Sequence, residues 1–299
     1  MATLKNTVID DTGTLQMPVG DTSQRPSTPV DGDCRYNTDL GHVEFYYRGF
    51  WVDARTNTGG ITGPNLELVL DVGNPASFTS GATNWLDVSG NDRHFTWSAT
   101  RTINYDTDHE HNSPGIPYVN TNGQRAEGPA SNSFNIDNTS GHTVFLVFKQ
   151  NTPVSTSAFR WEGGNGSTSS AGRGIFAHCS WSNSEIYYDV GGCCDADERT
   201  DTNSSPYGTP IMNRWGVFAF RTLANKGPRS IWKNGIQLVE NTTTSTDINL
   251  NGTAAQVGNS REYANTWDAR LAFFAIYSTG LDDDDMIRNT VALRNKFGI

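Results

Sequence analysis

Basic residues are scarce in this chain of 299 residues. Lysine and arginine together number 22, against 32 aspartates and glutamates, so the formal net charge at pH 7 is −10. A chain with this excess of negative charge is repelled by the phosphates of nucleic acids and by anionic membrane surfaces. The charge therefore argues against nucleic acid as a partner and leaves glycans and other proteins as candidates.

Long apolar runs are missing as well. No window approaches the length of a membrane-spanning helix, and the opening residues MATLKNTVIDDTG lack the basic flank and apolar core of a signal peptide. We therefore expect no membrane insertion and folding in a cytoplasm. The motifs GxSxG, HExxH, GxGxxG and GxxxxGK(S/T) are also missing, and we expect a protein that is not an enzyme.

Cysteine is rare: the four residues are too few for a disulfide scaffold in a chain of this length. Two of them, Cys193 and Cys194, are adjacent. Such a pair can form a vicinal disulfide or a soft metal contact, whereas a reduced pair in a loop fits a protein made in a reducing cell. We expect the reduced pair.

The abundant residues indicate an all-β protein. The chain has 30 glycines, many Thr, Ser and Asn, and 18% charged residues, a composition typical of short strands joined by many turns. Residues 55–64, RTNTGGITGP, have the composition of a linker. We expect a small N-terminal module in residues 1–62 and one large domain in residues 63–299.

The large domain is predicted to be a two-sheet antiparallel sandwich. Ten or so runs of β-branched and aromatic residues, each four to eight residues long, are bounded by Gly, Asn, Ser or Pro. One hairpin is specified by Asn234-Gly235, because this pair favours a type I′ turn.

One helix is predicted, at the C-terminal end. The aspartates from Asp282 to Asp285 complement the positive N-terminus of a helix, and Gly298 follows its end. The apolar residues of the helix, between the aspartates and the glycine, are Met286, Ile287, Val291, Leu293 and Phe297.

The N-terminal module is predicted to be a small β meander. The runs RYNT, VEFYYRG and FWVDA are short and β-rich, and turns at residues 39–41 and at Gly49 separate them. Three strands of this size bury too little apolar surface to be stable alone. We therefore expect the module to associate with copies of itself or with a partner.

This module resembles a repeated module of bacteriophage tail fibres and related virion proteins. The resemblance depends on Leu15, Pro18, Val19, Gly20, Arg25, Pro26, Pro29, Gly32, Arg35, Tyr36, Asn37, Gly41, Glu44, Tyr46, Gly49 and Trp51. It implies a virion protein whose partners are other virion proteins and copies of itself, as a homotrimer.

Residues 66–299 resemble the concanavalin A-like lectin/glucanase superfamily in its laminin-G-like form. The matching segments are LVLDVGNPASF, the turn with Trp85, Asp87, Ser89, Gly90 and Asn91, the WKNG hairpin, QVGNS and DARLAFFAIYSTGLDDDDMI. The resemblance implies a jelly roll of two curved antiparallel sheets with the helix packed outside. Many members bind carbohydrate, a minority cleave it and many do neither, so the fold leaves the function open.

A candidate glycan-binding strand contains Glu185, Tyr187 and Asp189, which share one face by the two-residue period of a strand. Carboxylates accept hydrogen bonds from sugar hydroxyls, and a tyrosine ring packs against the apolar face of a sugar. The glucanases of the superfamily carry three alternating acids on one strand. The third acid is missing here, which argues against hydrolysis. An outer-face strand without a ligand is the alternative.

Three more aromatic residues, Trp161, Trp181 and Tyr188, are candidate surface platforms for a sugar ring. Two long loops, residues 162–174 and 191–206, border the candidate strand, and binding sites on rigid sandwiches are commonly built from such loops.

The second loop is acidic and is a candidate calcium site. The oxygen ligands that it offers are Asp195, Asp197, Glu198 and Asp201, and Asp268 is a further candidate outside the loop. The alternative is an acidic loop that is simply solvated.

Together, the two parts predict a phage virion structural protein. Its N-terminal module would dock or trimerise, and its lectin-like domain would bind a host surface glycan or receptor, as in a tail-fibre or appendage adhesin. The alternative is a capsid or neck decoration protein that cements its neighbours and binds no sugar. A depolymerase that cleaves host polysaccharide is a third interpretation.

Overall fold

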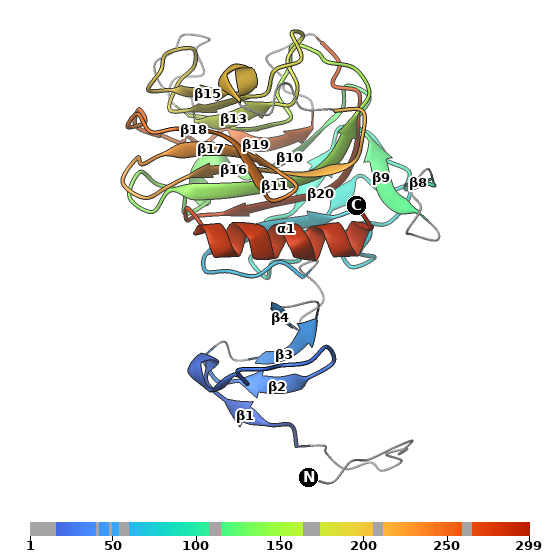
Figure 1. Ribbon diagram of the computed structural model, residues 1–299. Coiled ribbons are helices and arrows are strands. Elements are labelled where there is room, and N and C mark those ends of the chain that lie inside the picture. The colour runs from blue at the N-terminus through green and yellow to red at the C-terminus, as the bar shows by residue number, and fades with distance from the viewer. Residues whose placement is uncertain are drawn as a thin grey trace. The chain divides into compact units, whose positions relative to one another are not determined.

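The computed structural model describes residues 16–39, 42–47, 50–53, 60–107, 115–163, 174–205, 212–258 and 265–299. Contacts within the chain divide it into two compact units, Met1–Arg55 and Thr56–Ile299. The predicted fold class is confirmed, because the second unit is an antiparallel sandwich and the described residues contain one α-helix, at the C-terminal end (Figure 1).

The first unit contains one small sheet with the strand order β1-β2-β3-β4. Its strands are β1 (Val19–Gly20), β2 (Cys34–Asn37), β3 (His42–Tyr47) and β4 (Phe50–Asp53). The last three pair as an antiparallel meander, as predicted, whereas β1 adds a short parallel edge that the sequence did not indicate. A short 3₁₀-helix, η1 (Thr22–Gln24), lies between β1 and β2 and is capped by Asp21.

One face of the small sheet is closed by a polar network around Glu44. This carboxylate is 1% exposed. Arg25 donates to it from Nε at 3.2 Å, Asn37 donates from Nδ2 at 3.2 Å, and Nε of Arg35 lies 3.4 Å from Oε1. Two guanidinium groups and an amide therefore satisfy a buried carboxylate, as burial of a charge requires.

The opposite face of the small sheet is apolar and open. Arg35 and Asn37 in β2 point to the polar network, so the alternate residue Tyr36 points away from it, as does Phe45 in β3. Tyr36 is 38% exposed, Phe45 is 43% exposed and Val19 in β1 is 61% exposed. Neither hydrophobic core cluster of the described residues includes a side chain of this unit.

The second unit contains two sheets, and the one named here the β13 sheet has eight strands in the order β15-β14-β13-β12-β19-β10-β7-β6. Its strands are β6 (Asn84–Trp85), β7 (Phe95–Trp97), β10 (Arg125–Ala130), β12 (Phe159–Trp161), β13 (Ile175–His178), β14 (Tyr187–Val190), β15 (Arg199–Asp201) and β19 (Ala254–Gly258).

The other sheet, named here the β11 sheet, has the order β18-β17-β16-β11-β20-β9-β8, and β5 pairs with β20 beside this path. Its strands are β5 (Leu66–Asp71), β8 (Asn104–Asp106), β9 (Ile116–Asn120), β11 (His142–Gln150), β16 (Gly216–Thr222), β17 (Arg229–Lys233), β18 (Ile236–Asn241) and β20 (Ala269–Tyr277).

Aromatic and aliphatic side chains fill the space between the two sheets. The β13 sheet contributes Phe159 and Trp161, and the β11 sheet contributes Phe218 and Phe274, among many others. The rings of Trp161 and Phe274 stack with centroids 5.5 Å apart. Contact between aromatic rings adds to the free energy gained by burial, so this layer is the main core of the unit.

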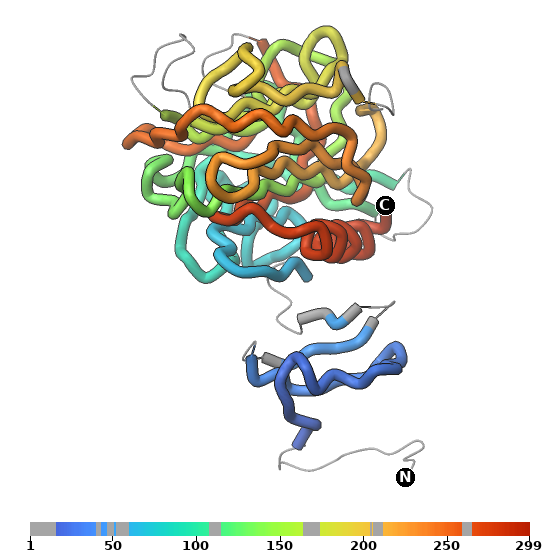
Figure 2. Tube along the Cα trace, turned by 60° about the vertical axis from the view of Figure 1, so that its left-hand side comes forward, coloured from blue at the N-terminus to red at the C-terminus, as the bar shows by residue number. Residues whose placement is uncertain are grey.

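The outer face of the β11 sheet is also apolar, and the helix α1 (Asp283–Phe297) covers it. Phe145 of β11 and Phe273 of β20 form a second buried cluster with Met286, Leu293 and Phe297 of the helix. Seen as a tube from another side, α1 lies on the outside of the sandwich (Figure 2). Strand β11 is therefore continuously apolar from Val144 to Phe148, because both of its faces are buried there.

The ends of α1 lie where the sequence predicted them. The Asp282 side chain accepts a hydrogen bond from the Asp285 amide, and Gly298 ends the helix with a φ of 68°. Among its apolar residues, Ile287 is 39% exposed. Asn289 is buried instead, because its amide bonds to the Thr62 carbonyl oxygen and contacts the Tyr277 hydroxyl. Val291 is half-buried.

The predicted hairpin is confirmed. Strands β17 and β18 pair around Asn234 and Gly235, whose φ angles of 52° and 84° are those of a type I′ turn. Within the described residues, α1 is neither long enough nor apolar enough to cross a membrane.

Candidate functional site

The candidate glycan-binding strand is β14, and its alternate residues face away from the core. Tyr188 and Val190 belong to the cluster between the sheets. Tyr187 and Asp189 therefore share the outer face of the β13 sheet, as the two-residue period predicted. Glu185 lies just before the strand and not within it.

Strand pairing continues this outer face as a row of residues across the sheet, and all of them except Phe176 are polar. Across the sheet, Arg199 pairs with Asp189, Asp189 with Phe176, Phe176 with Arg160, Arg160 with Gln256, and Gln256 with Glu127. The central members are buried although they face outward: Asp189 is 0% exposed, and Arg160 and Gln256 are each 1% exposed. The row opens to solvent at its β15 end, where the Arg199 side chain is 22% exposed.

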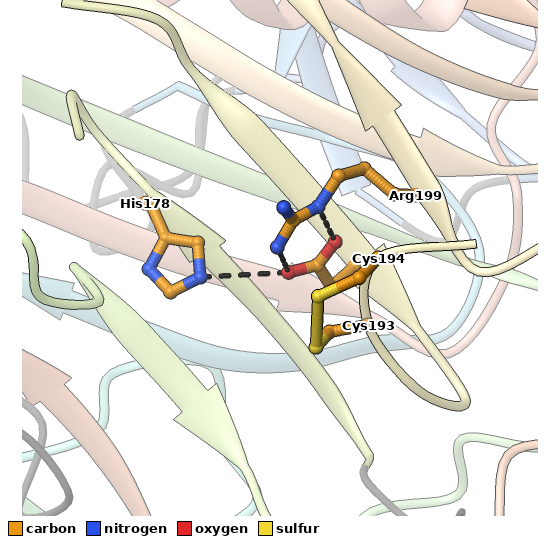
Figure 3. The surroundings of a disulfide bond; sticks show 5 residues. His178, Cys193, Cys194 and Arg199 are labelled. Atoms are coloured by element: carbon orange, nitrogen blue, oxygen red, sulfur yellow. Dashed lines mark hydrogen bonds and ion pairs between the residues drawn. A yellow bond between two sulfur atoms is a disulfide. The ribbon is translucent and has the colours of Figure 1, made fainter. Parts of the chain in front are cut away.

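Asp189 is bound by Arg199 and lies beside His178 (Figure 3). Arg199 donates from Nε and from its terminal nitrogen to the two carboxylate oxygens, each at 2.7 Å. Nε2 of His178 lies 3.4 Å from the same carboxylate. Burial by itself lowers the pKa of Arg199, but the hydrogen bond and the charge of Asp189 raise it above its usual value. The pair is a fixed ionic unit at the edge of the sheet.

His178 is oriented from its other side by the chain around residue 157. Its Nδ1 lies 3.0 Å from the carbonyl oxygen of Thr156 and 3.2 Å from the hydroxyl of Ser157. A carbonyl oxygen only accepts, so Nδ1 carries the hydrogen and donates it. This nitrogen is then not a base for Ser157, and the buried Ser157–His178–Asp189 arrangement does not activate a serine nucleophile.

Two half-buried aromatic rings flank the ionic unit. The rings of Trp181 and His178 have centroids 4.5 Å apart, and the rings of Trp181 and Tyr187 have centroids 6.4 Å apart. The guanidinium of Arg199 lies over the Tyr187 ring at 4.4 Å, and Asn183 donates to the Tyr187 hydroxyl at 2.7 Å. The Tyr187 ring is thereby fixed on one face and at its hydroxyl.

Two carboxylates lie beside these rings. Glu185 accepts a hydrogen bond from the Thr202 hydroxyl. Asp201, which pairs with Tyr187 across β14 and β15, accepts from the Asn203 amide at 3.0 Å and so caps the short 3₁₀-helix η4 (Thr202–Ser204). Both side chains are half-buried. Each carboxylate has four lone-pair positions, so both can accept further hydrogen bonds from a ligand.

The acidic loop between β14 and β15 is firmly held. Arg229 and Asn241 both donate to the carbonyl oxygen of Ala196, at 2.9 and 2.8 Å, and the Thr246 amide donates to the Asp197 carbonyl oxygen at 2.9 Å. Most of loop 162–174 (residues 164–173) lies outside the described residues, as does residue 206 at the end of the second predicted loop.

The predicted calcium ligands have separate roles. Asp195 and Asp197 are exposed, Asp201 caps η4, and Asp268 accepts from Asn151 at 3.1 Å. Glu198 is 7% exposed. Its burial, and then the charges of the neighbouring aspartates, raise its pKa. In the described part of the chain, no three His, Cys, Asp or Glu side chains are gathered as a metal site would require.

The expectation of a reduced cysteine pair is wrong. Cys193 and Cys194 form a vicinal disulfide in the loop between β14 and β15 (Figure 3). Cys194 has a φ of 88°, and Gly191 nearby has a φ of 76°. The loop therefore adopts backbone conformations that few residues other than glycine accept. In the sequence, the adjacency of the two thiols was the only signal for the bond.

Two predicted surface platforms are buried. Trp161 is 0% exposed because its ring packs between the sheets against Phe274. Tyr188 is 0% exposed, and its hydroxyl bonds to His142 and to Thr222 within the core. Strand β14 was placed correctly, but an aromatic residue on an inward position packs into the core. Trp181 remains a candidate platform.

Sequence reasoning missed Arg199, His178 and Asn183 as members of the site. Arg199 follows the acidic loop in sequence and reaches Asp189 only because β14 and β15 form a hairpin. The alternation of residues in two paired strands is the signal that could have found it.

No family model matches the chain, and no curated protein matches it in sequence. Solved structures do match its fold. The binding domain of Paraclostridial Mosquitocidal Protein 1 matches 76% of this chain and 52% of its own, with a TM-score of 0.51 and 15% identity. The binding domain of botulinum neurotoxin DC in complex with rat synaptotagmin II matches 77% of this chain and 52% of its own, with a TM-score of 0.51 and 15% identity.

A third match is domain 4 of AbnA, a GH43 extracellular arabinanase from Geobacillus stearothermophilus, in complex with arabinotriose. It covers 76% of this chain and 98% of that domain, with a TM-score of 0.50 and 13% identity. This chain spans about half the length of the first two solved chains, 52% of each. At these identities the likeness shows a shared β-sandwich fold, and the function has to be argued from the site.

Proposed function

We propose that this protein is an adhesin that binds glycan on the outer face of its β13 sheet, at the end formed by β13, β14 and β15. The observation that carries the proposal is the half-exposed pair of rings, Trp181 and Tyr187, next to a fixed set of polar groups. Sugar rings have an apolar C–H face and a polar hydroxyl edge, and lectin sites match both.

Each group of the site has a defined role. The Trp181 and Tyr187 rings pack against the C–H face of one sugar residue. Glu185 and Asp201 accept hydrogen bonds from its hydroxyls, and the exposed edge of Arg199 donates to a ring or hydroxyl oxygen. Because Asp189 holds Arg199 on both oxygens, the donor is in position before the ligand arrives, which lowers the entropy lost on binding.

The structural neighbours support a binding role. Two of them are binding domains of toxins, and a third carries arabinotriose. We propose no hydrolysis at Glu185 and Asp189, because Asp189 is 0% exposed and its two oxygens are occupied by Arg199. A glycosidase needs both carboxyl groups at the scissile bond.

The N-terminal unit is the basis for proposing where the protein works. It resembles the bacteriophage tail-fibre module, and its open apolar face with Tyr36 and Phe45 fits docking to virion proteins or to further copies of the chain. We therefore place the adhesin in a virion, as part of a tail fibre or other appendage, with a homotrimer as the expected assembly. Several copies on one particle would raise a weak affinity per site by multivalency.

A glycan array tests the binding role. We expect the wild-type chain to bind one class of glycan and the variants Trp181→Ala and Tyr187→Ala to lose at least about tenfold in affinity, since each removes a stacking ring. Tyr105→Ala is the matched control, because Tyr105 is a 50% exposed tyrosine in β8 of the other sheet. Equal binding by all four proteins, or none by the wild type, would refute the site.

The alternative is a capsid or neck decoration protein that binds no sugar, and the open apolar face of the N-terminal unit favours it as much as it favours an adhesin. Electron cryomicroscopy of an intact particle distinguishes the two. An adhesin shows the β14 face open to solvent, whereas a cement protein buries that face against its neighbours.

A further inference from the structure

We propose that the site on β13, β14 and β15 selects uncharged glycans and rejects those that carry a sugar carboxylate, such as sialic or uronic acids. The inference rests on the proposed glycan binding and names its ligand class. It follows from the signs and the pairing of the charges around Trp181 and Tyr187.

Negative charges surround the two rings. Glu185 and Asp201 lie at the rim of the site and are half-exposed, and the loop between β14 and β15 adds the exposed Asp195 and Asp197 and the buried Glu198. An anionic sugar at the rings would lie beside Glu185 and Asp201, because Asp201 pairs with Tyr187 and Glu185 precedes Tyr187 by two residues, and like charges repel most at short range. The loop carboxylates add to the negative field at this end of the sheet.

Arg199, the arginine beside the rings, is not available for a two-pronged contact with a sugar carboxylate. Arg199 already makes a two-pronged contact with Asp189, at 2.7 Å for each bond, and its flat face lies over Tyr187. Recognition of a carboxylate by arginine commonly uses this same two-pronged geometry. A sugar carboxylate could accept only from the exposed edge of Arg199 while Asp189 stays in place. The two-pronged contact would require it to displace Asp189, which is 0% exposed and would be left as a buried charge without its partner.

The two other arginines near this end of the sheet are also engaged. Arg229 is buried and donates to the Ala196 carbonyl oxygen from behind the acidic loop. Arg160 is 1% exposed, and its Nε lies 2.8 Å from Oε1 of Glu162. Among the described residues around the site, these three arginines thus donate to oxygen atoms of the protein itself. The acids at the rim face solvent.

The raised pKa of Glu198 agrees with this charge distribution. Burial is its largest cause, and the charges of Asp195, Asp197 and Asp189 add to it. A field that disfavours ionisation of Glu198 also disfavours an incoming carboxylate near the same loop. Uncharged hydroxyls face no such cost, because they donate hydrogen bonds to the rim acids.

The experiment uses matched glycan pairs, each a neutral oligosaccharide and the same oligosaccharide with a terminal sialic acid or with a uronic acid in place of the neutral sugar. For the full-length chain, we expect the acidic member of each pair to bind at least about tenfold more weakly. Raising the salt concentration from about 0.05 M to about 0.5 M should reduce the difference, because screening weakens the repulsion.

A double variant, Asp195→Asn with Asp197→Asn, tests the source of the discrimination. It removes two loop charges, keeps the shape of the side chains and leaves the rings and rim acids in place. We expect it to narrow the neutral-to-acidic affinity ratio about two- to fivefold without changing the affinity for neutral glycans. The control Asp284→Asn removes one exposed charge from α1, on the other side of the sandwich, and should not change the ratio.

The outcomes separate this inference from the proposed function. Acidic glycans that bind as tightly as neutral ones, with that binding lost in Trp181→Ala, would overturn the charge selection and leave the glycan site intact. An unchanged ratio in the double variant would also overturn it. Failure of every glycan to bind the wild-type chain would refute the proposed function, and this inference with it.

Discussion

The two units of this chain bury opposite kinds of residue. The sandwich buries aromatic rings such as Trp161 and Phe274 between its sheets. The small N-terminal sheet buries the carboxylate of Glu44 under two arginines and an asparagine, and it leaves Tyr36 and Phe45 in solvent. In the small sheet polar and apolar residues alternate, and the apolar side is the open one.

The difference has a physical consequence for stability. A sandwich of two large sheets removes enough apolar surface from water to fold by itself. A four-stranded sheet whose buried face is ionic gains little from the hydrophobic effect, because an ion pair roughly offsets its own desolvation. We therefore expect the sandwich to be stable as a monomer, and the small unit to depend on cover for its apolar face.

The largest expected effect is on the sandwich core. Trp161→Ala removes a fully buried ring that contacts Phe274, Phe159 and Phe134. We expect it to lower the free energy of unfolding by about 3–5 kcal/mol, measured by denaturant unfolding of the second unit. Trp181→Ala is the control, because its ring is half-exposed, and it should cost clearly less. Equal losses in the two variants would contradict the assignment of Trp161 to the core.

The second-largest expected effect is the loss of stability of the small unit when its buried ionic network is disrupted. Glu44→Ala leaves Arg35 buried without its carboxylate and should destabilise residues 16–53 by about 3 kcal/mol, measured by amide hydrogen exchange. The control Glu127→Ala removes a surface pair with Arg125, whose side chains are 39% and 33% exposed, and should cost less than about 0.5 kcal/mol. Unchanged exchange in residues 16–53 would show that the network does not stabilise the sheet.

A pH effect on stability is expected for the sandwich. Burial lowers the pKa of His142 from 6.5 to about 3. The unfolded chain takes up a proton near pH 6.5 and the folded chain does not, so stability is complete above pH 6.5 and falls as the pH is lowered. The slope from this residue is about 1.4 kcal/mol per pH unit down to about pH 3.

The variant His142→Gln isolates this contribution. Carboxylates also titrate in this range, so the comparison is between the pH profiles of the variant and the wild type, each obtained by denaturant unfolding. We expect the variant to be less stable at pH 7 and to have a shallower profile between pH 6.5 and 4. Parallel profiles would mean that His142 takes up its proton while folded.

The features of the fold that could be predicted from the sequence are those that depend on residues close together in the chain. The hairpin at Asn234-Gly235 and the ends of α1 were predicted, because turn chemistry and helix caps are properties of a few adjacent residues. The burial of Asn289 in α1 was not predicted. Asn289 is buried by bonds to Thr62 and Tyr277, and no local pattern contains those partners.

The candidate site shows the same limit. The outward pair Tyr187 and Asp189 followed from alternation within one strand, whereas the bond from Arg199 to Asp189 needs the register of β14 against β15. Trp161 was misplaced for a related reason. Its strand was recognised, but which of the two faces points to the core depends on the second sheet.

The smallest expected effect on stability concerns the apolar face of the small unit, and it tests the comparison most directly. The double variant Tyr36→Ser with Phe45→Ser replaces two exposed side chains, so the free energy of unfolding of the sandwich should change by less than about 0.5 kcal/mol. If the face is covered in an assembly of copies, the same variant should dissociate that assembly, measured as molar mass by sedimentation or light scattering.

Ile236→Ser is the control, because Ile236 is 52% exposed in the sandwich but is a single residue at a hairpin. Single exposed apolar residues are ordinary on protein surfaces. A monomeric wild-type chain, or an assembly that survives the double variant and not the control, would show that the apolar face is not where copies meet, and its cover would then be a different protein.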